Sequence, residues 1–91
     1  MTMTETTESL LKFPTDFPIK VMGRSKDGFA QLVFEIVRKH APDYDGATME
    51  LRPSSAHNWL SVTCTIVARS REQLDALYSE LSAHPDVAMV L

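Results

Sequence analysis

The 91-residue sequence has one cysteine, three glycines and no stretch approaching the roughly 20 apolar residues of a membrane-spanning helix. A single cysteine excludes an internal disulfide framework and is compatible with a reducing compartment. The N-terminal residues alternate threonine and glutamate, without the basic start and apolar run of an export signal. These absences predict a cytoplasmic protein that does not enter a membrane.

An excess of positive charge is also absent. Nine lysines and arginines stand against twelve aspartates and glutamates, which gives a net charge of −3. This balance provides no general attraction to phosphate backbones or anionic lipids, so nucleic acid is not expected as a partner. The length allows one domain. We expect residues 1–13 to form a flexible tail that could carry a short helix, and residues 14–91 to form the domain.

Apolar periodicity indicates the elements of that domain. Alternating side chains predict four strands, over residues 17–22, 48–52, 59–69 and 87–91. The spacing of apolar residues from Phe29 onward predicts an amphipathic helix that is capped by Asp27 and ends before a proline. Ser70 and Gln73 form a capping box for a second helix, which also ends before a proline.

This order of elements predicts an α+β fold, the ferredoxin-like βαββαβ two-layer sandwich with sheet order 4-1-3-2. Right-handed crossovers place both helices on one face of the four-stranded antiparallel sheet and leave the other face open. The open face is expected to carry four candidate interface residues. Three of them, Met22, Val67 and Val90, are expected close together, and the fourth is Trp59. A partner-binding face and an ordinary mixed surface are equally compatible with this composition.

Several short motifs occur at a spacing that is typical of one family. They include Leu11-Lys12-Phe13-Pro14, Lys20-Val21-Met22-Gly23, His40-Ala41-Pro42 and Pro53-Ser54-Ser55. In these motifs the chain resembles the YbeD family of small bacterial proteins of unknown function. The resemblance implies a fold similar to the ACT-type regulatory domain. The chain departs from the family at His57, where the family tends to have a glycine.

The segment from Gly23 to Phe29 also resembles the strand-to-helix loop of ACT domains. Those domains generally bind amino acids or similar small metabolites near this loop, usually at a subunit interface. The resemblance implies Gly23, Asp27 and Gly28 as ligand-binding candidates. The plainer alternative is that Gly23 relieves backbone strain at the strand end and Asp27 only caps the helix.

Residues suited to catalysis or metal binding are few. Cys64 lies on the inward row of the longest strand, which predicts a buried and inert thiol. The three histidines lie in separate connections and lack the spacing of a metal site. Trp59 is the one aromatic residue available for stacking bases on the sheet. We therefore expect no catalytic residue, no metal and no cofactor.

The expected function is that of a non-catalytic regulatory or protein-interaction module that acts through its open sheet face or its edges. Its partner would be an unidentified protein or a second copy of the chain in a homodimer. The alternative is an ACT-like sensor of a small metabolite, such as an amino acid, that uses the first strand-to-helix loop. An RNA-binding module is the weakest of the three hypotheses, because aromatic pairs and basic flanks are missing.

Overall fold

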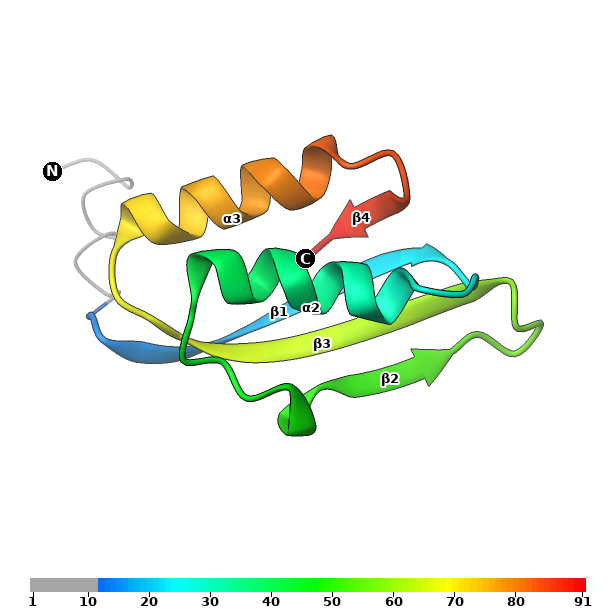
Figure 1. The fold of residues 1–91 in the computed structure, drawn as a ribbon, viewed down its shortest axis with the longest axis horizontal. Helices are drawn as coiled ribbons and strands as arrows, with labels where there is room; N and C mark the ends of the chain where they lie inside the picture. Colours follow the sequence, from blue (N-terminus) through cyan, green and yellow to red (C-terminus); the bar gives the residue numbers. More distant parts are fainter. Residues whose placement is uncertain (1–11) are drawn as a thin grey trace, which may run out of the picture.

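A computed structural model describes residues 12–91, which form a sheet of four antiparallel strands with two helices on one face (Figure 1). The strands are β1 (Thr15–Arg24), β2 (Glu50–Pro53), β3 (Trp59–Ala68) and β4 (Val87–Val90). The helices are α2 (Phe29–His40) and α3 (Arg71–Ala83), and a short 3-10 helix, η1 (Gly46–Thr48), precedes β2. The observed order β2-β3-β1-β4 confirms the predicted ferredoxin-like fold. The predicted tail lies outside the described residues, apart from its last two positions.

The core lies between the sheet and the helices. The inward rows of the two central strands supply buried side chains at Ile19, Val21, Val62, Cys64, Ile66 and Ala68. The helices cover them with Phe29, Val33, Ile36, Val37, Leu74, Leu77 and Leu81. Each Val, Leu, Ile or Phe side chain among them contributes about 2 kcal/mol through burial. The period-two and helical patterns of the sequence are confirmed in this layer.

Prolines lie at both exposed edges of the sheet. Lys20 exchanges two backbone hydrogen bonds with Leu91, at 3.2 and 2.8 Å, so its N–H and C=O point toward β4. Pro18 has the same orientation because it lies two residues earlier, but β4 does not extend that far. At the other edge, the Ser54 N–H donates to the Trp59 carbonyl (2.9 Å), so Pro53 faces outward. Neither proline removes a ladder hydrogen bond, and both make the edges poor templates for another strand.

The N-terminus of α2 differs from the prediction that Asp27 caps it. The capping residue is Gly28, which has a φ of 87° and whose carbonyl accepts a hydrogen bond from Leu32 N–H (2.9 Å). No side chain caps this helix. The preceding turn is closed by a 3.2 Å bond from Phe29 N–H to the Lys26 carbonyl. This turn requires a left-handed residue directly before the helix, and glycine adopts that conformation without steric cost.

The cap of α3 is confirmed, with one difference in detail. The Ser70 hydroxyl accepts a hydrogen bond from Gln73 N–H at 3.1 Å. The Gln73 side chain accepts in return from Arg69 N–H (2.6 Å), one residue earlier than a standard capping box. Its amide nitrogen also donates to the His40 carbonyl (2.9 Å) at the end of α2. One side chain thus joins the end of the first helix to the start of the second.

The turn between β2 and β3 contains a strained residue that gives a stability prediction. His57 has a φ of 59°, the left-handed region, which costs a non-glycine residue about 1 kcal/mol. We expect His57→Gly to raise the free energy of unfolding by about that amount in urea denaturation. The matched control is Ala56→Gly in the same turn, which is expected to lower it because glycine adds entropy to the unfolded chain. A loss of stability in His57→Gly would contradict the assignment.

Candidate functional site

The open face of the sheet, opposite the helices, carries rows of side chains whose order is fixed by the strand register. The first row crosses all four strands through Arg52, Ser61, Met22 and Met89. The second row contains Glu50, Thr63, Lys20 and Leu91. The third row, at the end of the two central strands, contains Trp59 and Arg24.

Large apolar side chains are uncovered on the β1 and β4 side of this face. Met89 is 50% exposed and Leu91 is 61% exposed, and Met22 lies between them and β3. These three residues are called the methionine patch below. Trp59 is 39% exposed in the adjacent row. The patch is therefore the part of the open face where a partner could bury the most exposed apolar surface.

The predicted position of Val90 on the open face was wrong. Val90 lies opposite the fully buried Val21 and packs against the core. A β-bulge explains the difference, because Met22 lies opposite Met89 while the next residue, Gly23, lies opposite Val87. The extra residue at the bulge breaks the strict alternation on which the prediction depended. Met89 consequently faces outward in the place expected for Val90.

The predicted proximity of Val67 to Met22 was also wrong. Val67 is on the open face, but it lies opposite Asp16, whereas Met22 lies opposite Ser61. Six residues of extended strand separate the two positions on β3, which is about 20 Å. Of the four interface candidates, the structure brings together Met22 and Trp59 at one end of the sheet, and it places Val67 at the other.

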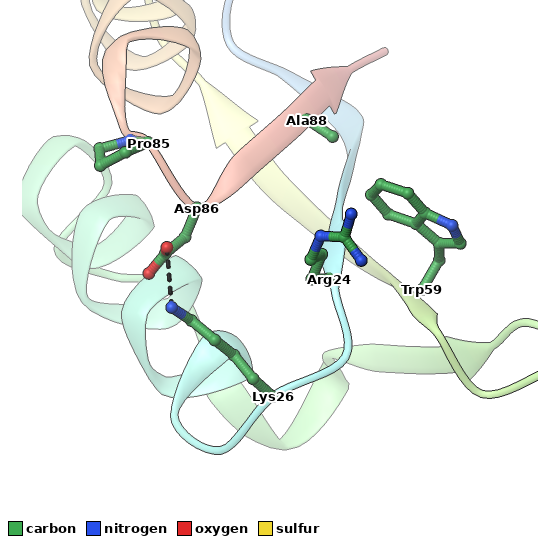
Figure 2. Close-up of a pocket in the computed structure, with 6 residues that line it drawn as sticks. All are labelled: Arg24, Lys26, Trp59, Pro85, Asp86 and Ala88. Carbon is green, nitrogen blue, oxygen red and sulfur yellow. Dashed lines mark hydrogen bonds and ion pairs between the residues drawn. The ribbon is translucent and has the colours of Figure 1, made fainter.

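A pocket of about 170 Å³ lies beside the β1–α2 loop and is lined by Arg24, Lys26, Trp59, Pro85, Asp86 and Ala88 (Figure 2). The Lys26 ammonium lies 2.8 Å from an Asp86 carboxylate oxygen, and the hydrogen bond from Lys26 holds the pKa of Asp86 below its usual value. The Arg24 guanidinium lies 5.1 Å from the centre of the Trp59 ring, a cation–π contact. The pocket therefore combines an ion pair with a cation held over an aromatic face.

The three predicted ligand-binding residues do not line this pocket. Gly23 is buried, and a Cβ there would lie 2.5 Å from the Phe29 ring and closer still to the Asp86 carbonyl oxygen. Asp27 and Gly28 are exposed on the loop. Sequence reasoning missed five of the six lining residues: Arg24, Lys26, Pro85, Asp86 and Ala88. The sequence offers one indication of them: they lie in or next to the β1–α2 loop, or near the start of the last strand. Only the fold shows that these two segments are neighbours.

The remaining polar groups join parts of the fold. His40 and Lys39 at the end of α2 lie 2.7 and 3.2 Å from one carboxylate oxygen of Glu80 on α3, and the His40 hydrogen bond lowers the pKa of Glu80. Cys64 is fully buried, and burial raises the pKa of its thiol. Within residues 12–91, no three His, Cys, Asp or Glu side chains are grouped as metal ligands. No helix in the same range is long and apolar enough to cross a membrane.

The fold defines the class of this protein, which is a ferredoxin-like βαββαβ domain. Its structure is similar to the ACT domain of the GTP pyrophosphokinase of Chlorobium tepidum in solution, with a TM-score of 0.63, 20% identity and 84% of each chain covered. It is also similar to protein HP0495 from H. pylori, with a TM-score of 0.71, 12% identity, and 100% of this chain and 96% of that chain covered.

The sequence identifies the family within this class. Residues 8–91 match the family described as a protein of unknown function, DUF493, and the chain belongs to that family. UPF0250 protein NE1487 of Nitrosomonas europaea is 55% identical over 86 residues, which are 94% of this chain and 99% of that protein. A UPF0250 protein of Janthinobacterium sp. is 50% identical over the whole length of both. The predicted YbeD-like relationship is thereby confirmed.

Proposed function

We propose that this protein is a non-catalytic regulatory module that binds another protein through the open face of its sheet. The observation that supports this most directly is the methionine patch, in which Met89 and Leu91 are at least half exposed beside the partly buried Met22. Contiguous exposed apolar groups favour an interaction site over a plain solvated face. Methionine is also suited to such a surface, because its flexible side chain adapts to the shape of a partner.

The open face is favoured over the edges of the sheet as the binding surface, although the sequence alone is compatible with either. The β1 edge beyond β4 contains Pro18, and the β2 edge ends at Pro53. Both strands at the edges, β2 and β4, are four residues long. Short strands and outward-facing prolines are features by which proteins prevent edge pairing. The apolar surface that remains for binding is on the face.

Charge introduced into the patch tests this proposal. Met89→Glu is expected to reduce capture of a partner from native cell extract by at least tenfold, because a carboxylate would be desolvated in the interface. The control is Thr65→Glu, an exposed position on the same face, opposite Pro18 and away from the patch. Light scattering of the purified chain identifies the case in which the partner is a second copy. Equal capture by wild type and Met89→Glu would overturn the proposal.

A second candidate function is the sensing of a small metabolite. The pocket at Arg24, Lys26 and Asp86 favours it, since it presents cationic and anionic groups beside the loop that resembles the ligand-binding loop of ACT domains. A thermal-shift screen with amino acids tests this function. A ligand at a hundred times its dissociation constant would stabilise the fold by about 2.7 kcal/mol, and Lys26→Ala would remove the shift. If no amino acid changes the melting temperature, amino-acid sensing is excluded.

A further inference from the structure

A shallow hollow next to the methionine patch distinguishes one kind of partner from others. Its volume is about 340 Å³, and it is lined by Lys20, Glu50, Leu51, Arg52, Ser61 and Thr63. The short side chains of Ser61 and Thr63 come from β3, between longer side chains on the neighbouring strands. The hollow is therefore a trough with hydroxyl groups at its floor and charged groups at its walls, and it is called the hydroxyl trough below.

Two cations on opposite walls of the trough are not neutralised within residues 12–91. Neither Lys20 nor Arg52 has an ion pair or side-chain hydrogen bond to any described residue, and both are exposed. The third cation of the three rows, Arg24, lies over Trp59. Against these three cations the rows contain one side-chain carboxylate, that of Glu50. This end of the open face is locally positive, although the whole chain has a net charge of −3.

The positions of the two cations suit a single carboxylate between them. Lys20 is on β1 opposite Thr63, and Arg52 is on β2 opposite Ser61, with β3 in the middle. Two strand spacings and a two-residue offset separate their Cα atoms by about 12 Å. Both side chains are long enough to meet over the trough. A carboxylate there would accept hydrogen bonds from both cations and from the hydroxyl groups beneath, and charge-assisted bonds of this kind are the stronger ones.

We infer that the partner contacts this face with an acidic amphipathic segment. Its apolar side chains lie on Met22, Met89 and Leu91, and one of its carboxylates occupies the hydroxyl trough between Lys20 and Arg52. The inference rests on the proposed function and specifies its partner. Glu50 repels additional negative charge on the β2 side, so it limits the segment to a carboxylate on the diagonal between the two cations.

RNA is a poorer match to the same surface. Bases bound to a sheet of this topology stack on exposed aromatic pairs of the central strands. Trp59 is the one aromatic side chain in the three rows, and the guanidinium of Arg24 already lies over it. The adjoining apolar surface is made of methionine and leucine, which present no flat ring to a base. A peptide with apolar and acidic side chains uses all of these features.

Selection from a peptide-display library tests the inference without a known partner. Random 20-residue peptides are selected on the wild-type domain, with counter-selection on Met89→Glu. Selected peptides are expected to combine apolar residues with an excess of Asp and Glu, and to shift backbone amide NMR signals in the first two rows of the open face. Their affinity should fall steeply with added salt, because exposed charges are screened. A neutral or basic consensus, or no selected peptide, would overturn the inference.

Charge reversal supplies the matched variants. Lys20→Glu/Arg52→Glu is expected to weaken the selected peptides at least tenfold, and Arg38→Glu/Lys39→Glu, with the same change in charge on the helix side, is expected to leave them unchanged. Equal effects of the two double variants would overturn the inference. So would a single-stranded oligouridine probe that binds wild type and loses binding in Lys20→Glu/Arg52→Glu, since it would assign the trough to RNA.

The same variants distinguish a failure of this inference from a failure of the proposed function. If capture from extract depends on Met89 but not on Lys20 and Arg52, the open face binds a protein that is not acidic, and only the inference fails. If capture depends on neither and no peptide is selected, both fail.

Discussion

Replacing Gly23 with alanine is expected to lower the free energy of unfolding by about 3 kcal/mol, the upper part of the usual range for overpacking. The added Cβ would lie 2.5 Å from the Phe29 ring and closer still to the Asp86 carbonyl oxygen. Neither neighbour can move freely, because Phe29 is 1% exposed and the Asp86 oxygen belongs to the backbone. Urea denaturation followed by circular dichroism measures the loss.

Gly46→Ala is the matched control for this effect. A Cβ at Gly46 would also meet an aromatic ring, at 2.6 Å from an edge carbon of Phe34. Phe34, however, is only partly buried and can turn toward solvent. We expect a loss of about 1 kcal/mol or less, the low end of the cost of overpacking. A loss in Gly23→Ala no greater than that in Gly46→Ala would show that the start of β4 yields, contrary to the packing described above.

Replacing Tyr44 with phenylalanine is expected to have the opposite sign and to stabilise the fold by about 1 kcal/mol. Tyr44 is 5% exposed, and its hydroxyl has no hydrogen-bond partner within residues 12–91. Burial, together with the neighbouring Cys64 thiol, raises the pKa of this hydroxyl to about 12. The ring contributes independently, since it packs against Phe34 with centroids 6.2 Å apart. Phenylalanine keeps the ring contact and removes a buried polar group that has no partner.

Tyr78→Phe is the control for the loss of a tyrosine hydroxyl. The Tyr78 hydroxyl donates a hydrogen bond to the Leu91 carbonyl at 3.3 Å, so its removal should cost about 0.5–1 kcal/mol. Both variants are compared with wild type by thermal and urea denaturation. The interpretation of Tyr44 would be contradicted if both variants lost stability by the same amount.

The fold could be predicted from the sequence because its core rows are regular. Ile19, Val21, Val62, Cys64 and Ile66 alternate strictly, and the two central strands that carry them pair along their whole lengths. The same alternation failed in β4, where a bulge adds a residue that composition does not reveal. The local sequence pattern thus predicts that a strand forms. Which side chains of a short edge strand point toward the core is determined by its pairing with the neighbouring strand.

The candidate site was harder to predict for a related reason. Met22 and Trp59 were assigned to the open face from the local pattern, and the structure places both there. The distance of Met22 from Val67 depends on the register between β1 and β3, which are separated in the chain by a helix and a strand. No turn fixes that register, so it follows from core packing alone. Asp27 was misplaced because a glycine turn, instead of a side chain, begins α2.

Because of the bulge in β4, the deletion of one residue there would affect the two candidate binding surfaces, the pocket and the methionine patch, in different ways. Ala88 is the residue with no counterpart on β1, and it lines the pocket near Arg24, while its neighbour Met89 belongs to the methionine patch. A chain without Ala88 would run inward, outward, inward through Val87, Met89 and Val90 as an ordinary strand. Deletion of Ala88 would therefore remove a wall of the pocket and leave the methionine patch in place. A single deletion could thus abolish binding in the pocket without changing binding at the patch.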